Sequence, residues 1–198
     1  QDPHVKQAIQ EFPGLRLLNQ DFETTLFSFI ISANSNIKAI RTKIRKLASL
    51  IGNKIEINER NFYTFPTAQA INNAQIELLL SVGLGYRAEY VKAAANLLVE
   101  NPSLELHFRS LPDDELHIEL KKIPGVGDKV AHCVAVFGLQ RRNLFPLDLW
   151  GRRIASDLYQ IDPKTPYKLM HKQLVENFNG YASYASQFLF EWYRNGRG

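Results

Sequence analysis

The feature that most constrains this chain is a short turn, Ile123-Pro-Gly-Val-Gly127, between two segments whose apolar residues have helical spacing. The segment before it, which ends near Lys122, has the pattern of a helix end. The segment after it is predicted to be a helix over residues 128–137, because its apolar residues recur at that spacing: Val130, Ala131, Val134 and Phe137. A third helix is expected to open at Pro146-Leu-Asp148, with Asp148 as its N-cap.

The turn combines features that suit contact with a phosphate group. Gly125 and Gly127 permit a tight turn and close approach by another molecule. The N-terminus of the next helix presents open N–H groups, which form a ready phosphate site. Lys129 lies in the first turn of that helix, where the helix dipole disfavours a protonated amine. A neutral lysine amine is a nucleophile, and the Asp148 carboxylate, 19 residues later, can face the same cleft.

Each of these features also has a purely structural explanation. Glycine-rich hairpins join helices in many proteins, a lysine in a first helical turn is usually a surface residue, and an N-cap aspartate usually does no more than cap. The ordered combination favours a functional site: an apolar helix, the turn, Lys129, Cys133 one helical turn later, and then Pro-x-Asp.

The remaining sequence predicts an all-α fold with short loops. Further helices are expected at residues 5–11, 22–33, 37–51, 66–71, 73–82, 86–100, 102–111, 149–159, 164–178 and 181–193. The helix at 22–33 is apolar on several sides and should be buried. The helix at 37–51 is amphipathic, and its lysines and arginines could simply form a solvent-exposed face. Residues 56–63 are expected to be irregular, and no clear strand is predicted.

We expect these helices to form two lobes. One comprises residues 26–138 and carries the helix-hairpin-helix unit at 116–138; the other comprises residues 1–25 and 139–198. The active site is expected in the cleft between the lobes, with Lys129 and Asp148 on its walls.

Composition limits the function classes further. A net charge of +4 and a pI near 9.1 suit a nucleic-acid partner. A single cysteine excludes an internal disulfide and a four-cysteine iron–sulfur cluster, and it favours a reducing compartment. No apolar run reaches 18 residues and no signal peptide is evident, so we expect no membrane partner and an intracellular location, either cytoplasm or nucleoid in a prokaryote or the nucleus in a eukaryote. Because the sequence begins with Gln1 rather than Met, we expect a trimmed or partial chain.

Several motifs, in order along the chain, resemble the helix-hairpin-helix (HhH-GPD) DNA glycosylases, and within them the 8-oxoguanine DNA glycosylase/lyases. The resemblance covers most of the chain, from Asp2 to about Phe190. It rests on residues 12–18, 26–36, 83–87, 124–133 and 146–148. By this resemblance, Lys129 would attack the sugar C1′, expel the base and form a Schiff base that leads to β-elimination. Asp148 would stabilise the positive charge that develops on the sugar. The resemblance implies no cofactor, no iron–sulfur cluster and no metal ion beyond a monovalent cation on the hairpin carbonyls.

The resemblance also assigns DNA contacts by matching position. Asn34 would enter the stack that the flipped nucleotide vacates, and Tyr86 and Arg87 would contact the estranged cytosine. The remaining residues expected to contact DNA are Gly125, Val126, Gly127, Trp150 and Arg153. The base pocket would be lined by Pro146, Cys133 and Phe190. The implied partner is double-stranded DNA with oxidised guanine opposite cytosine, bound by a monomer.

The chain departs from the family pattern at several positions. Ser186 stands where the family has a glutamine that reads the base edge, and Gln187 follows one place later; we favour Gln187 as the reader because its amide both donates and accepts. Ser35 interrupts an asparagine run, and Trp150 replaces a histidine. The sequence has no counterpart of the family's β-rich N-terminal region, and we expect either that this region was removed or that the protein works without it. Two alternatives therefore stay open: a glycosylase for a different damaged base, and a non-catalytic helix-hairpin-helix DNA-binding module.

Overall fold

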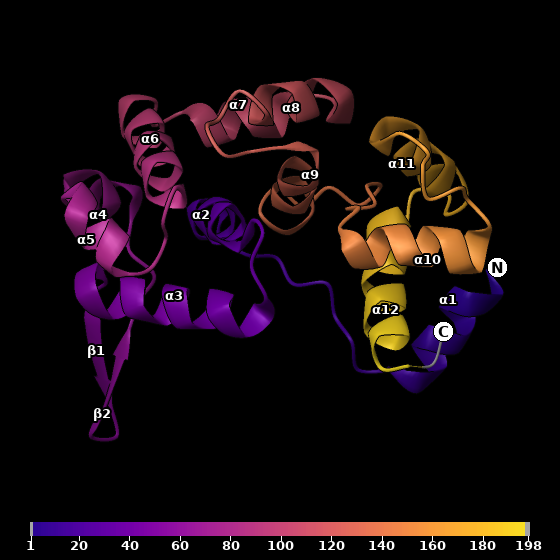
Figure 1. Cartoon of the computed structure of the whole chain (residues 1–198), viewed down its shortest axis with the longest axis horizontal. Coiled ribbons are helices and arrows are strands. Elements are labelled where there is room, and N and C mark those ends of the chain that lie inside the picture. The colour runs from indigo at the N-terminus through magenta and orange to yellow at the C-terminus, as the bar shows by residue number, and fades with distance from the viewer. Residues whose placement is uncertain (1, 197–198) are drawn as a thin grey trace. The chain divides into compact units, whose positions relative to one another are not determined.

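The computed structural model describes residues 2–196, which form twelve helices and one two-stranded sheet (Figure 1). The chain divides into two compact units. Residues 20–134 form the first, here called the HhH unit, and residues 1–19 with 135–198 form the second, here called the terminal unit. The predicted all-α fold class is confirmed, apart from the small sheet.

The HhH unit is organised around a buried helix, α2. Its helices are α2 Phe22–Ser32, α3 Ile37–Ile51, α4 Ala68–Asn73, α5 Ile76–Ser81, α6 Arg87–Glu100, α7 Leu104–Ser110, α8 Asp113–Leu120 and the start of α9 Asp128–Phe137. Four hydrophobic residues of α2 have no exposed surface: Leu26, Phe27, Ile30 and Ile31. Burial of each such side chain contributes roughly 1.5–3 kcal/mol. Helix α6 packs against α2, α4 and α5, and the buried Ala94 and Ala95 permit close approach.

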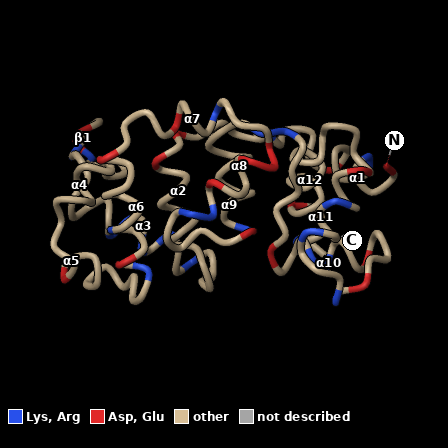
Figure 2. The backbone as a smooth tube through the Cα atoms, turned by 90° about the horizontal axis from the view of Figure 1, so that it is seen from above, with Lys and Arg blue, Asp and Glu red and all other residues tan. Residues whose placement is uncertain are grey.

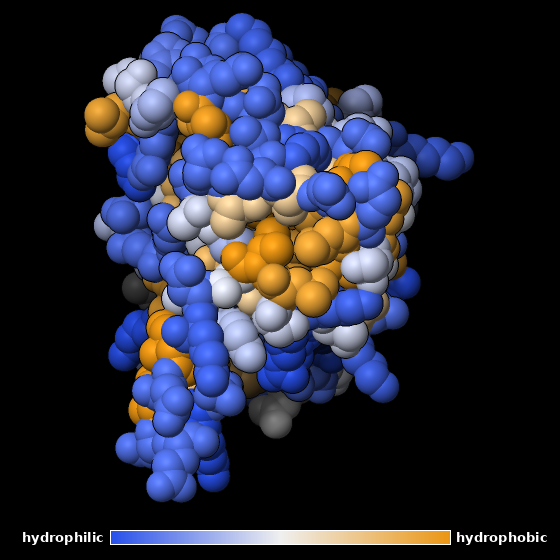
Figure 3. All heavy atoms as spheres, turned by 90° about the vertical axis from the view of Figure 1, so that its left-hand side faces the viewer, coloured by the Kyte–Doolittle hydropathy of each residue, from blue (hydrophilic) through white to orange (hydrophobic). Residues whose placement is uncertain are grey.

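The prediction that residues 56–63 are irregular is wrong. Strand β1, Lys54–Ile57, pairs antiparallel with β2, Arg60–Tyr63, through a turn at Asn58 and Glu59, which both have positive φ. Two positive φ values are typical of a hairpin turn whose usual sequence is Asn-Gly. This chain has Glu59 in place of the glycine, so its sequence does not indicate the turn. All residues of both strands are exposed, so neither strand shows an alternation of buried and exposed residues. Figure 3 shows hydrophobic residues among hydrophilic ones on this projecting hairpin.

Two predicted helix boundaries are also corrected. Residues 73–82 do not form one helix, because the chain is extended at Ala74 and Gln75 between α4 and α5. The ammonium group of Lys92 donates to the carbonyls of Asn72 and Ala74, which stabilises the end of α4. Helix α11, Tyr167–Glu176, starts later than expected because Pro166 disfavours a helical conformation of the residue before it.

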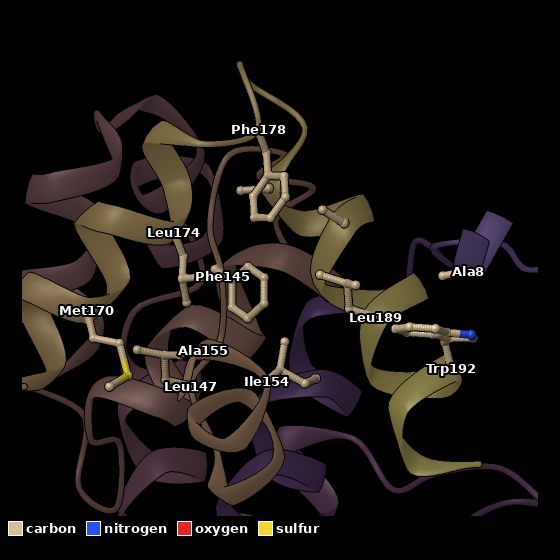
Figure 4. Packing of buried hydrophobic residues seen from close by; sticks show 12 residues of the cluster. Ala8, Phe145, Leu147, Ile154, Ala155, Met170, Leu174, Phe178, Leu189 and Trp192 are labelled. Atoms are coloured by element: carbon tan, nitrogen blue, oxygen red, sulfur yellow. The ribbon is translucent and has the colours of Figure 1, made fainter. Parts of the chain in front are cut away.

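The terminal unit has its own hydrophobic core (Figure 4). Its helices are α1 Pro3–Glu11, α10 Leu149–Tyr159, α11 and α12 Ala182–Arg194. Helix α12 packs against α1 and α10, and Leu189 and Trp192 of α12 are buried. The buried Ser183 hydroxyl accepts from the Leu144 N–H at 3.1 Å and lies 2.9 Å from the Leu144 carbonyl. These two contacts attach the loop before Pro146-Leu-Asp148 to helix α12.

Candidate active site

The turn between α8 and α9 is held against α6. Gly125 has a φ of 84°, and a Cβ at this position would lie 2.8 Å from the Cβ of Tyr90. A larger residue at 125 would therefore strain the backbone and clash with α6. At Gly127, by contrast, φ is not positive and a Cβ would meet no atom within 4 Å. The fold itself thus requires glycine at 125 but not at 127.

The backbone N–H groups of the turn differ in availability. Val126 donates its N–H to the Ile123 carbonyl at 3.0 Å, so this group, which was expected to face a phosphate, is engaged within the turn. Within residues 2–196 the N–H groups of Gly125 and Gly127 make no hydrogen bond. The first-turn N–H groups of α9 have no partner within the helix. The phosphate site that the turn can offer therefore consists of the two glycines and the start of α9.

Lys129 lies in the first turn of α9, as predicted, and is partly buried. Its Nζ lies 4.8 Å from the centroid of the Phe29 ring of α2, within the range of a cation–π contact. Among residues 2–196 the amine forms no ion pair. No carboxylate of the described chain thus neutralises this amine. Cys133, one turn later on α9, is buried.

Asp128, next to Lys129, is engaged by α8. Its carboxylate accepts hydrogen bonds from Lys121 Nζ and from His117 Nε2, the latter at 3.0 Å. Partial burial raises the pKa of the Asp128 carboxyl, but the hydrogen bonds from Lys121 and His117 outweigh that effect and hold the pKa below its ordinary value. These bonds tie the end of α8 to the start of α9. This cluster was not predicted from the sequence, although His117 and Lys121 lie four residues apart at the end of α8.

A second cluster joins the loop after α2 to the start of α6. Asn34 has a positive φ of 48°, and its side-chain amide donates to the Tyr86 hydroxyl at 3.1 Å. Tyr86 is 54% exposed, and its ring lies 4.5 Å from the guanidinium carbon of Arg87. Asn34 and Tyr86, to which the family resemblance gives separate DNA contacts, are thus adjacent and exposed.

Arg87 has a different setting from the one expected. It is only 8% exposed, and its guanidinium donates to the carbonyls of Ala33, Asn34 and Leu84 in four hydrogen bonds. An arginine has five N–H donors, so one remains for any base contact. In this structure Arg87 mainly holds the backbone that carries Asn34.

In the terminal unit, Asp148 is the N-cap of α10, as predicted. Its Oδ1 accepts from the Gly151 N–H at 2.9 Å, while its Oδ2 makes no hydrogen bond within the described residues. A Cβ at Gly151 would lie 2.9 Å from the Pro146 carbonyl oxygen, so the turn from Pro146 to α10 requires glycine there. One carboxylate oxygen is therefore fixed by the fold and the other remains available.

The candidate base-reading residues lie on α12. Ser186 Oγ donates to the Ser183 carbonyl at 2.9 Å, which occupies its only proton. The Gln187 amide makes no hydrogen bond within residues 2–196, and the partly exposed Phe190 ring lies 5.3 Å from the guanidinium carbon of Arg194. These contacts leave Gln187 freer than Ser186 to bind a ligand.

Trp150 and Arg153 lie together on α10. The guanidinium carbon of Arg153 is 5.2 Å from the Trp150 ring centroid, and Tyr193 packs edge-on against the same ring. A hydrogen bond to Asp157 raises the pKa of the Tyr193 hydroxyl. Trp150 is therefore part of an aromatic and cationic cluster on the surface of the terminal unit.

The predicted site residues fall into two sets. The HhH unit contains Asn34, Tyr86, Arg87, Gly125, Val126, Gly127, Lys129 and Cys133. The terminal unit contains Pro146, Asp148, Trp150, Arg153, Ser186, Gln187 and Phe190. Among residues 2–196, no group of three or more His, Cys, Asp or Glu side chains could hold a metal ion. No helix of the described chain is long and apolar enough to cross a membrane.

The sequence is similar to a family of DNA repair proteins. The family model described as HhH-GPD superfamily base excision DNA repair protein matches residues 27–179. The chain is 30% identical over 200 residues to N-glycosylase/DNA lyase OGG1 of Arabidopsis thaliana, an alignment that covers 96% of this chain and 54% of that protein. It is 34% identical over 160 residues to the Saccharomyces cerevisiae N-glycosylase/DNA lyase, covering 75% of this chain and 43% of the relative.

The fold also matches solved structures. The Clostridium acetobutylicum 8-oxoguanine glycosylase/lyase, solved with double-stranded DNA containing cytosine opposite 8-oxoguanine, superposes with a TM-score of 0.93 at 32% identity. That match covers all of this chain and 68% of the other. The chain spans about half the length of the curated relatives it matches.

Proposed function

Because the chain belongs to the HhH-GPD superfamily of base excision DNA repair proteins, we propose that it is a DNA glycosylase and AP lyase that excises 8-oxoguanine from duplex DNA. The observation that carries this proposal is the setting of Lys129, which lies in the first turn of α9 directly after the hairpin. Its amine lies over Phe29 and pairs with no carboxylate of the described chain. The similarity to N-glycosylase/DNA lyases supports this assignment.

In the proposed reaction Lys129 is the nucleophile. Its neutral amine attacks C1′ of the damaged nucleotide, the bond from C1′ to the base breaks, and the base leaves with the bonding electrons and takes up a proton. Loss of a proton from the amine and opening of the sugar ring give a Schiff base. The Schiff base acidifies C2′, and removal of a C2′ proton expels the 3′ phosphate. A glycosylase that uses water instead would stop at the abasic site, so Lys129 determines the lyase step.

Asp148 is proposed to stabilise the positive charge that develops on the sugar as the base departs. A fixed carboxylate is most effective when it is already oriented before the reaction. The hydrogen bond from Gly151 to Oδ1 supplies this orientation and leaves Oδ2 for the substrate. The N-cap role of Asp148 therefore serves its catalytic role.

The remaining residues are proposed to bind DNA with the damaged nucleotide flipped out. Asn34 enters the stack that the flipped nucleotide vacates, and Tyr86 wedges beside the estranged cytosine. The N–H groups at Gly125 and Gly127 bind phosphate. Phe190 stacks on the flipped base and Gln187 bonds its edge, with Cys133 and Pro146 lining the pocket. This chemistry requires no cofactor and no iron–sulfur cluster, and a monomer provides every residue it uses.

Borohydride trapping tests the proposal. Borohydride reduces a Schiff base to a stable amine, so the protein should become covalently attached to a duplex with 8-oxoguanine opposite cytosine. Lys129→Gln should abolish both attachment and base release while damaged duplex still binds, because the phosphate contacts lie elsewhere. Lys122→Gln is the matched control, because Lys122 is exposed and its ammonium pairs, among the described residues, only with Glu119.

The same experiment separates the alternatives. Attachment to duplexes with oxidised pyrimidines or alkylated purines, and not to 8-oxoguanine, would replace the proposed substrate. DNA binding without base release from any damaged duplex would leave a non-catalytic binding module. Undiminished trapping by Lys129→Gln would assign the nucleophile to another residue.

A further inference from the structure

Helix α3 is strongly basic. It carries five cations, Lys38, Arg41, Lys43, Arg45 and Lys46, and no acidic residue (blue in Figure 2). Two of the five are engaged within the HhH unit, since Lys43 donates to the Ser35 hydroxyl and Lys46 to the Ser81 carbonyl. The other three, here called the α3 stripe, are exposed, and their side chains form no hydrogen bond or ion pair within residues 2–196.

The α3 stripe lies along one side of the helix. Its members, Lys38, Arg41 and Arg45, are three and four residues apart, a spacing that places side chains on the same face. With a rise of about 1.5 Å per residue, they extend over roughly 10 Å of the helix axis. Cations in such a row without acidic partners repel one another, and a polyanion that contacts all three would relieve that repulsion.

We infer that the α3 stripe binds the phosphate backbone of DNA and extends the contact beyond the damaged nucleotide. This inference rests on the proposed function, because it requires DNA at Asn34. Asn34 precedes Lys38 by four residues, so the two Cα atoms are at most about 15 Å apart. DNA that receives Asn34 in its stack therefore passes close to the start of the stripe.

The buried side of α3 argues for a nucleic acid rather than a lipid surface. A basic amphipathic helix binds a membrane by inserting its apolar side. In α3 the middle of that side is already covered by the HhH unit: Leu47 and Ala48 are buried and Ile40 and Ile44 are half-buried. Only Ile37 and Leu50, near the two ends of the helix, are exposed, which is too little apolar surface for insertion along the helix. Contacts made by the exposed cations alone are electrostatic, and they should depend steeply on salt concentration.

The test is the salt dependence of binding to an undamaged duplex. Each phosphate contact on B-DNA contributes about 0.9 to the slope of log affinity against log salt concentration. The triple variant Lys38→Gln, Arg41→Gln, Arg45→Gln should therefore bind with a slope that is shallower by about 2 to 3. Glutamine is a good helix former, so far-UV circular dichroism and the melting temperature should stay close to those of the parent.

Two controls make the outcome specific. Lys164→Gln, Lys168→Gln and Lys172→Gln remove the same charge from the region of α11 and should leave the slope unchanged. Arg41→Lys with Arg45→Lys keeps the charge of the stripe and should preserve the parent slope. An unchanged slope in the stripe variant, or an equal loss in the α11 control, would overturn the inference.

Excision measured on the same proteins separates this inference from the proposed function. With duplex at saturating concentration, the stripe variant should release 8-oxoguanine at the parent rate in a single turnover. If the parent releases the base and the stripe variant binds with the parent slope, only the stripe inference fails. If the parent releases no damaged base, the proposed function fails, and the slope still shows whether α3 contacts DNA.

Discussion

Asp148 is the N-cap of α10 and is also proposed to act in catalysis, and one substitution can separate the two roles. Asp148→Asn retains a good N-cap, so the free energy of unfolding should fall by less than about 1 kcal/mol. It removes the charge that the proposed reaction needs, so single-turnover excision should slow by about 10²–10³-fold. Thermal melts and rate measurements on 8-oxoguanine duplex check the two effects. A large loss of stability with near-normal excision would leave Asp148 as a cap only.

Gln187 and Ser186 are neighbours on α12 with different availability. The Ser186 hydroxyl already donates to the Ser183 carbonyl, whereas the Gln187 amide makes no hydrogen bond within the described residues. Gln187→Ala should therefore slow excision of 8-oxoguanine more than Ser186→Ala, by about tenfold if one hydrogen bond of about 1–1.5 kcal/mol is lost. Single-turnover rates with saturating duplex provide the measurement. If only Ser186→Ala slows the reaction, Ser186 reads the base.

At the residue scale, the sequence identified side-chain chemistry better than side-chain contacts. The motif around Lys129 and the cap at Asp148 were visible because both depend on local spacing. The four hydrogen bonds of Arg87 could not be predicted, because their acceptors are backbone carbonyls. Two of these carbonyls, those of Ala33 and Asn34, are more than fifty residues away in the chain. Tyr90 was missed for the same reason, since its contact with Gly125 arises only when α6 packs on the turn.

The helix-hairpin-helix turn is the element whose two glycines can be tested separately. Gly127→Ala fits the fold, so it should leave the melting temperature nearly unchanged while it weakens binding to damaged and undamaged duplex alike. Gly125→Ala should instead destabilise the protein, by about 1 kcal/mol or more, because of its positive φ and the contact with Tyr90. Melting curves and binding isotherms distinguish the two variants. If Gly127→Ala weakened binding to damaged duplex only, Gly127 would have to face the lesion.

Because Asp128 links α8 to α9, the free energy of unfolding should depend on pH in the acidic range. The folded-state pKa of Asp128 lies below its ordinary value, so its bonds to Lys121 and His117 stabilise the protein above about pH 4. That contribution is lost as the pH falls through the folded-state pKa. Because the Asp128 side chain is 38% exposed, Asp128→Asn should cost less than about 1 kcal/mol at pH 6. Denaturant titrations should show the difference from the parent shrinking below pH 4, and a pH-independent difference would contradict the ion-pair explanation.

Among elements, those with strong periodicity or caps were predicted and those set by distant contacts were not. Helices 128–137 and 149–159 have the predicted bounds because Asp148 and the glycine turn define their starts. The hairpin at 54–63 has no buried face, so its strands carried no hydrophobic alternation. The break between α4 and α5 depends on Lys92, which lies about one turn into another helix and gives no local signal.

At the scale of the whole molecule, each unit has its own core, while the proposed site draws residues from both. Both tryptophans, Trp150 and Trp192, lie in the terminal unit, so their fluorescence reports unfolding of that unit alone. Far-UV circular dichroism reports the helices of both units. Comparing the two signals therefore reveals which unit a ligand stabilises.

Duplex DNA should stabilise the two units together. With Lys129→Gln, which does not turn over, 8-oxoguanine duplex at one hundred times its Kd should add about 2.7 kcal/mol to the free energy of unfolding. That corresponds to roughly 5–10 °C in melting temperature for a chain of this size. Because Lys129 is in the HhH unit and Asp148 and Phe190 are in the terminal unit, the fluorescence and dichroism midpoints should both rise. If only the dichroism midpoint rises, DNA binds the HhH unit alone, and the roles proposed for Asp148 and Phe190 are wrong.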